Sequence, residues 1–203
     1  MIYLYYGEDS FSQIQAIKNL EEQVGMMEIR DANISRYVAR ETSKEGLIAA
    51  CMTMPFLAEK RLIIILGLWE YSLGKQSNKN KQSNKKNDGY EKSEWTDFWD
   101  VIEQIPDTTD IVFSEYNFSP SQKILSNLSE NWTVQEFPRM QEYALVNWIR
   151  KKTTDQQIQI QPNAISLLIE LIGSDLWELD NELEKLILYS SGQPITTNHV
   201  NTL

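Results

Sequence analysis

The turn at residues 7–11 is the first place where the chain offers a pattern with a known chemical use. A continuous apolar run at 2–6 precedes it, and a helical pattern follows it. A strand, a turn and a helix in this order bind the phosphates of a nucleotide when the turn reads GxxxxGK[ST]. Here the second glycine and the lysine are missing, and Glu8 and Asp9 stand where phosphate would lie. Carboxylates oppose an anion at a helix N-terminus, so we expect no nucleotide there, and Asp9 or Ser10 as the helix cap.

Other side chains that support catalysis or bind metals are scarce. Cys51 and His199 are the single cysteine and the single histidine, which excludes a disulfide framework and a Cys/His zinc site. We expect Cys51 to pack in the core and His199 to lie at the surface. Carboxylates such as Glu182 and Glu184 fall on different sides of a helix and are expected to be solvated. The sequence therefore predicts no catalytic residue, no metal ligand and no cofactor, and leaves open whether the chain is an enzyme.

A cluster of large apolar residues stands out at 52–57, which reads MTMPFL. Pro55 should end the preceding helix near Met54, because the residue before a proline avoids the helical conformation. One interpretation is that these side chains close the core, which is the commoner outcome. The other is a knob that binds a protein, since methionine and phenylalanine are frequent in adaptable apolar interfaces, where two of them would contribute about 1.5–3 kcal/mol each. The candidate binding residues are Met52, Met54, Phe56 and Leu57.

The composition limits the class of protein. The chain has 203 residues, 41% of them apolar and 24% charged, which is enough for one domain or two small ones. Six Trp, nine Tyr and six Phe exclude a chain that is disordered throughout. No apolar run of about 18 residues predicts a membrane span, and the N-terminus does not read as a signal peptide, so a cytoplasmic protein is the simplest expectation. A net charge of −10 disfavours a stand-alone nucleic-acid binder but excludes no protein partner.

A basic, low-complexity segment interrupts the pattern. Residues 72–87 read SLGKQSNKNKQSNKKN, with five lysines and no acid, and we expect a disordered insertion over 72–94. A solvated loop is the favoured interpretation. The alternative is a DNA contact through the five lysines, Lys75, Lys79, Lys81, Lys85 and Lys86.

Short apolar runs alternate with helical patterns before residue 138. We expect strands at 2–6, 27–29, 62–66, 110–115 and 132–137, and helices at 11–20, 44–52, 95–105 and 122–128. Such alternation predicts an α/β fold with a mainly parallel sheet. After Pro138 only helices are predicted: one around 143–150, one from Pro162, one capped by Ser174 and a short one from 196 or 197. The predicted domains are therefore 1–138 and a small helical domain, 139–203.

Several of these segments together resemble one protein family. They are IYLYYGEDSF at 2–11, MPFLAEKRLIIIL at 54–66, Trp148-Ile149, GSDLWELDNELEKLILY at 173–189 and ITTNHV at 195–200. In order and spacing they resemble the delta subunit of bacterial DNA polymerase III, the clamp-opening subunit of the replicative clamp loader. The resemblance implies an AAA+-like α/β domain without a functional P-loop, followed by a helical lid domain. The family also has a helical collar domain, which we expect to be absent here because the sequence stops where it would begin.

The resemblance also implies a function for the apolar cluster. In the family, a hydrophobic wedge inserts into the sliding clamp (the beta subunit); the matching residues are Met54, Phe56 and Leu57, with Met52 assisting. Family members often carry two aromatic residues after the proline, whereas the second position here is Leu57. The implied partners are the clamp, the other loader subunits, mainly through the collar, and DNA as part of the complex, in a bacterial cytoplasm. The implied subunit hydrolyses no ATP itself, although the holoenzyme is a DNA-directed DNA polymerase, a transferase.

Three alternatives stay open on the sequence alone. The chain could be an active NTPase with an unrecognised site. It could be a DNA-binding module that uses the basic loop. It could also be an architectural, inactive AAA+ subunit of the same loader, which would lack clamp affinity of its own.

Overall fold

A computed structural model describes residues 1–72, 95–102, 104–128 and 130–202. The chain divides into two compact units, Met1–Phe137 and Pro138–Leu203. The five lysines considered for DNA contact, Lys75, Lys79, Lys81, Lys85 and Lys86, lie outside the described residues, as does almost all of the predicted insertion at 72–94.

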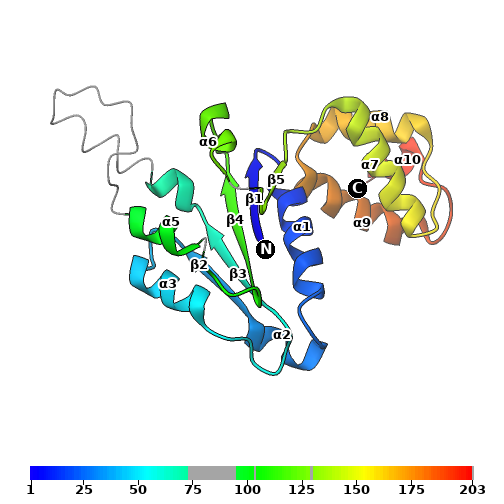
Figure 1. The fold of residues 1–203 in the computed structure, drawn as a ribbon. Coiled ribbons are helices and arrows are strands. Elements are labelled where there is room, and N and C mark those ends of the chain that lie inside the picture. Colours follow the sequence, from blue (N-terminus) through cyan, green and yellow to red (C-terminus); the bar gives the residue numbers. More distant parts are fainter. Residues whose placement is uncertain (73–94, 103, 129, 203) are drawn as a thin grey trace. The chain divides into compact units, whose positions relative to one another are not determined.

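The first unit is built on a five-stranded parallel sheet in the order β2-β3-β4-β1-β5 (Figure 1). The α/β fold with a parallel sheet is therefore confirmed. The central strands are apolar on both faces, as strands covered on both sides must be. The five strands are β1 (Ile2–Gly7), β2 (Ile34–Val38), β3 (Arg61–Leu66), β4 (Thr109–Tyr116) and β5 (Trp132–Glu136).

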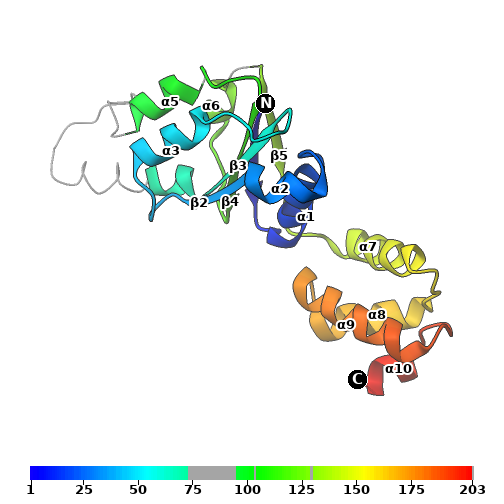
Figure 2. The same ribbon diagram turned by 90° about the horizontal axis from the view of Figure 1, so that it is seen from below.

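Helices cover both faces of this sheet (Figures 1 and 2). Alternate residues of β3 point to opposite sides: Leu62 and Ile64 pack with Ile17 of α1, whereas Ile63 and Ile65 pack in the cluster that holds the helices of the other face. This period of two is the geometry of a strand buried on both sides. The unit includes the helices α1 (Ser10–Glu22), α2 (Met27–Asn33), α3 (Lys44–Met52), α5 (Thr96–Ile102) and α6 (Gln122–Ser126), besides the helical residues 68–72.

The strand predicted at 27–29 is wrong. These residues begin helix α2. The strand that precedes α3 is β2, and no apolar run in the sequence predicted it. The reason is its place at the edge of the sheet, where none of its five residues is fully buried. A strand at an edge carries a weaker hydrophobic signal than the central strands do.

The described residues of the second unit, 138–202, form the helices α7 (Glu142–Asp155), α8 (Pro162–Ile172), α9 (Leu176–Ser190) and α10 (Thr197–Thr202). Ile149, Leu168 and Leu183 are almost completely buried at its centre. Pro162 begins α8, as predicted, but Asp175 rather than Ser174 caps α9 by accepting the N–H groups of Trp177 and Glu178. Among the described residues, no helix is long and apolar enough to cross a membrane.

Gly7 provides a test of how tightly the turn after β1 is packed. A Cβ added to Gly7 would lie 2.3 Å from the Phe137 carbonyl oxygen, and the backbone φ of +125° also disfavours a side chain. Gly67 is a matched control, because its φ is +70° but nothing lies within 4 Å of an added Cβ. We expect Gly67→Ala to cost about 1 kcal/mol of unfolding free energy and Gly7→Ala at least about 2 kcal/mol more, measured by urea denaturation. Equal losses in the two variants would contradict this packing.

Candidate functional site

The carboxyl ends of the strands, where open α/β sheets usually bind ligands, are closed here by the chain's own groups. The Asp9 N–H donates to the Phe137 carbonyl at 3.0 Å, and the Asp9 carboxylate accepts the Ser12 N–H at 2.9 Å, which caps α1. Gln13, which is fully buried, donates its side-chain amide to the Gly7 carbonyl at 3.2 Å. The N–H groups of Asp9 and Ser12, which lie in the segment that corresponds to a P-loop, are thus engaged within the protein.

Glu115 closes the same edge beside the end of β3. Its buried carboxylate accepts the N–H of Trp69 at 2.9 Å and that of Glu70 at 3.3 Å, in the helical residues 68–72 that follow the strand. Burial raises the pKa of Glu115 to about 7, although the backbone hydrogen bonds act to lower it. The geometry therefore gives Glu115 a structural part, which is to hold the start of a helix.

The raised pKa of Glu115 makes a prediction about stability. In the unfolded chain the carboxyl ionises near 4.5, whereas in the folded protein it keeps its proton up to about 7. The folded state is therefore favoured at low pH, and this contribution, up to about 3 kcal/mol, is lost as the pH rises from about 4.5 to about 7. Urea denaturation across this range should show the fall, and Glu115→Gln should flatten it. An unchanged slope in the variant would assign the pH dependence to another group.

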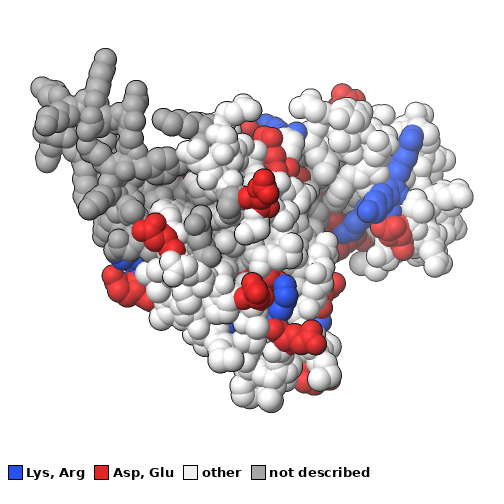
Figure 3. All heavy atoms as spheres, viewed as in Figure 1, with Lys and Arg blue, Asp and Glu red and all other residues white. Residues whose placement is uncertain are grey.

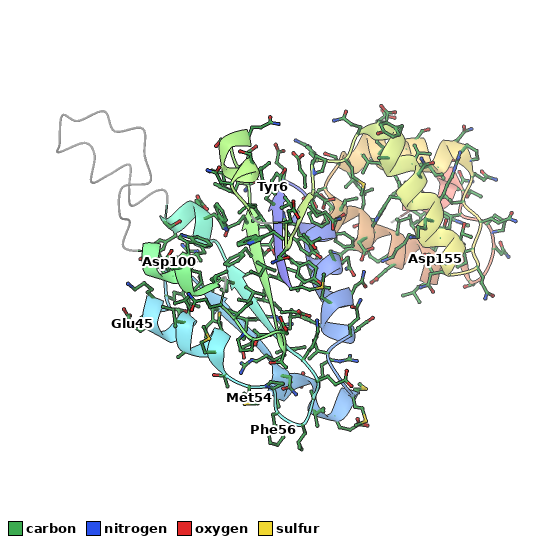
Figure 4. The ribbon with its side chains drawn as sticks, viewed as in Figure 1. Tyr6, Glu45, Met54, Phe56, Asp100 and Asp155 are labelled. Carbon is green, nitrogen blue, oxygen red and sulfur yellow. The ribbon has the colours of Figure 1, made fainter. Side chains whose placement is uncertain are left out.

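The apolar cluster at 52–57 lies on the surface. α3 ends at Met52, and the chain then forms a loop that leads to β3. The exposed fractions of the four candidate side chains are far above that of Cys51, which is buried as predicted, so these side chains do not close the core. They are 38% for Met52, 78% for Met54, 59% for Phe56 and 77% for Leu57. We call these four residues the apolar tip, and Figure 4 labels Met54 and Phe56 within it.

Hydrogen bonds from outside the loop hold the backbone of the tip. The Arg61 guanidinium, at the start of β3, donates to the Thr53 carbonyl at 3.2 Å. The side chain of Asn33, at the end of α2, accepts the Phe56 N–H at 2.6 Å and donates to the Phe56 carbonyl at 2.8 Å. Leu57 follows in the left-handed conformation, with a φ of 51°. The exposed side chains are thus carried by an anchored backbone.

Met26 and Met27, at the start of α2, are two further exposed apolar residues, which were not among those predicted from the sequence. Both are strongly exposed, at 71% and 81%. A Cβ on Gly25 would lie 3.3 Å from the Ala58 Cβ, so the turn before α2 lies against the loop just after Leu57. Two consecutive methionines are a sequence signal for an exposed apolar surface, but the prediction of a strand at 27–29 obscured it.

The surroundings of the tip carry few charges on the face that Figure 3 shows. In this view, which is that of Figure 4, the part of the surface where Figure 4 labels Met54 and Phe56 is mostly uncharged, with both acidic and basic side chains beside it. A surface of this kind fits an apolar pocket on a protein better than it fits a phosphate backbone.

The remaining reactive residues form no site. Burial raises the pKa of the Cys51 thiol to about 12, so it stays protonated and unreactive. His199 is half-buried: its Nδ1 accepts the Thr196 N–H at 3.3 Å, and its ring packs edge-on against Tyr189. Within the described ranges, His, Cys, Asp and Glu residues make no group of three that could hold a metal ion.

The strand order, the helices on both faces and the closed turn define an AAA+-like α/β protein with a helical second unit. A family model described as the DNA polymerase III delta subunit matches residues 3–137, and one described as a middle domain matches 141–202. The chain belongs to the family of DNA polymerase III delta subunits.

Individual proteins are similar to this chain over nearly its whole length. The Bacillus subtilis DNA polymerase III subunit delta is 20% identical over 204 residues, which is 100% of this chain and 56% of that protein. The structure of the Bacillus subtilis DNA clamp loader delta protein matches with a TM-score of 0.66 at 19% identity, over 100% of this chain and 57% of that one. A Thermotoga maritima RuvB variant matches with a TM-score of 0.55 at 12% identity, over 98% and 59% of the two chains. The chain thus spans somewhat more than half the length of these relatives.

Proposed function

We propose that this chain is the clamp-opening part of a bacterial clamp loader, and that the apolar tip binds the sliding clamp. The observation that carries the proposal is the exposure of Met54, Phe56 and Leu57 on a loop whose backbone is tied to α2 and β3. Exposed aromatic and methionine side chains on a fixed backbone are typical of binding anchors. Met26 and Met27 lie on the adjoining turn and extend the apolar surface offered to the clamp.

The opening mechanism follows from differential binding. If the tip prefers the clamp conformation in which one subunit interface is sprung, binding shifts the clamp toward that conformation, and no hydrolysis by this chain is needed. The other loader subunits would bind ATP and control access to the tip. Contacts with them would be made in the cytoplasm, mainly through a collar domain, and DNA would be bound as part of the complex.

Replacing the central anchor tests the proposal. Phe56→Ala should weaken binding of the chain to the sliding clamp of the same organism by about 2–4 kcal/mol, or roughly 30- to 1000-fold, because the pocket loses its aromatic occupant. Isothermal calorimetry measures this directly. The matched control is Leu171→Ala on α8, a similarly exposed apolar residue (64%) that should leave the affinity unchanged. A folded wild-type chain without clamp affinity would instead favour the architectural, inactive AAA+ subunit.

Absence of nucleotide binding is a separate expectation. The Asp9 N–H is engaged by Phe137, and the carboxylates of Glu8 and Asp9 stand at the turn, so we expect the turn to disfavour the phosphates of ATP. Titration of the chain with ATP and magnesium in the calorimeter should give no binding heat, while the clamp titrated into the same sample should. Saturable ATP binding at submillimolar concentration would support the active NTPase alternative.

A further inference from the structure

Asn33 is the last residue of α2, and its side chain is 1% exposed. Its Nδ2 donates to the carbonyls of Ile29 at 3.0 Å and Phe56 at 2.8 Å, and its Oδ1 accepts the Phe56 N–H at 2.6 Å. Both backbone groups of Phe56 are therefore bound by one side chain that lies 23 residues away in sequence. We propose that Asn33 is a positioning residue for the apolar tip, and this proposal rests on the proposed function of the tip in clamp binding.

The tip needs such an anchor because little else holds it. Within the described part of the chain, residues 54–60 make no backbone–backbone hydrogen bond. The side chains of Phe56 and Leu57 point into water and contribute little packing, and Leu57 adopts a left-handed conformation that an L-residue rarely adopts without support. The Arg61 guanidinium fixes only the beginning of the loop, at Thr53. Asn33 therefore holds the backbone of Phe56, whose side chain is the main anchor of the tip.

Removing the Asn33 side chain should change the rate at which the tip binds the clamp more than the contacts that the bound tip makes. Without the amide, the tip adopts its binding conformation in only a fraction of molecules, and the apparent affinity falls by that fraction. If the fraction is about one tenth, the dissociation constant rises about tenfold. Once bound, Phe56 fills the same pocket, so the dissociation rate should stay near that of the wild type, and the loss should lie in association.

The experiment compares three variants of the 203-residue chain on immobilised sliding clamp by biolayer interferometry. Asn33→Ala should slow association about tenfold with little change in dissociation, whereas Phe56→Ala should mainly speed up dissociation. Ile102→Val is the control for general loss of stability, since Ile102 is buried in a core cluster that includes neither Asn33 nor Phe56. This control should bind like the wild type at a temperature where all variants are folded.

Amide hydrogen exchange of the wild-type chain tests the bond itself and does not depend on any variant folding. The Phe56 N–H should exchange at least about tenfold more slowly than the Leu57 N–H, which has no comparable acceptor in the described loop. Equal exchange at the two positions would overturn the proposal. So would an Asn33→Ala variant that is folded and associates at the wild-type rate while Phe56→Ala has lost affinity. If Phe56→Ala keeps full affinity, the proposed function itself fails.

Discussion

Burial of β3 on both faces is the constraint on which the rest of the structure depends. Four consecutive residues of this strand, Leu62 to Ile65, are at most 1% exposed, and they supply both core clusters of the first unit. Each buried aliphatic side chain contributes about 1.5–3 kcal/mol, so moving the strand out of the core would cost several times this free energy. The loop that carries the apolar tip runs directly into this strand and begins at a helix whose Cys51 is fully buried. The core therefore fixes both ends of a loop whose own apolar side chains lie in water.

The two ends of the parallel strands differ in what they carry. The turn at Gly7 and the carboxylate of Glu115 lie at the carboxyl ends of the strands, where both take part in hydrogen bonds within the chain. The loop before β3 and helix α2 before β2 enter at the amino edge, which is where Asn33 meets Phe56. In most open α/β sheets the carboxyl edge is the binding edge. Here the exposed apolar tip lies at the other end of the strands, away from the turn at Gly7.

The sequence predicted the parts of the fold that depend on local pattern. The apolar runs at 2–6 and 62–66 correspond to strands, and the helix at 44–52 has the bounds of α3, because burial and helix periodicity leave direct traces in sequence. The edge strand β2 left no such trace. The exposure of Phe56 was one of two open interpretations, since an apolar residue after a proline packs inward or outward according to its tertiary neighbours. The pairing of Asn33 with Phe56 joins segments 23 residues apart and could not be derived from either segment alone.

Under the proposed function the chain has only binding energy with which to favour an open clamp, and the rigidity of the tip is then decisive. Ordering a backbone costs about 1–2 kcal/mol per residue, so a free loop of six residues would lose about 6–12 kcal/mol on binding. Two anchors such as Phe56 and Leu57 return only about 1.5–3 kcal/mol each. A flexible tip would therefore spend its whole binding energy on its own ordering and leave none to favour the open clamp. Because hydrogen bonds from Asn33 and Arg61 order the tip when the domain folds, its entropy cost is met by folding and not by clamp binding. The buried core around β3 supplies the stability for this.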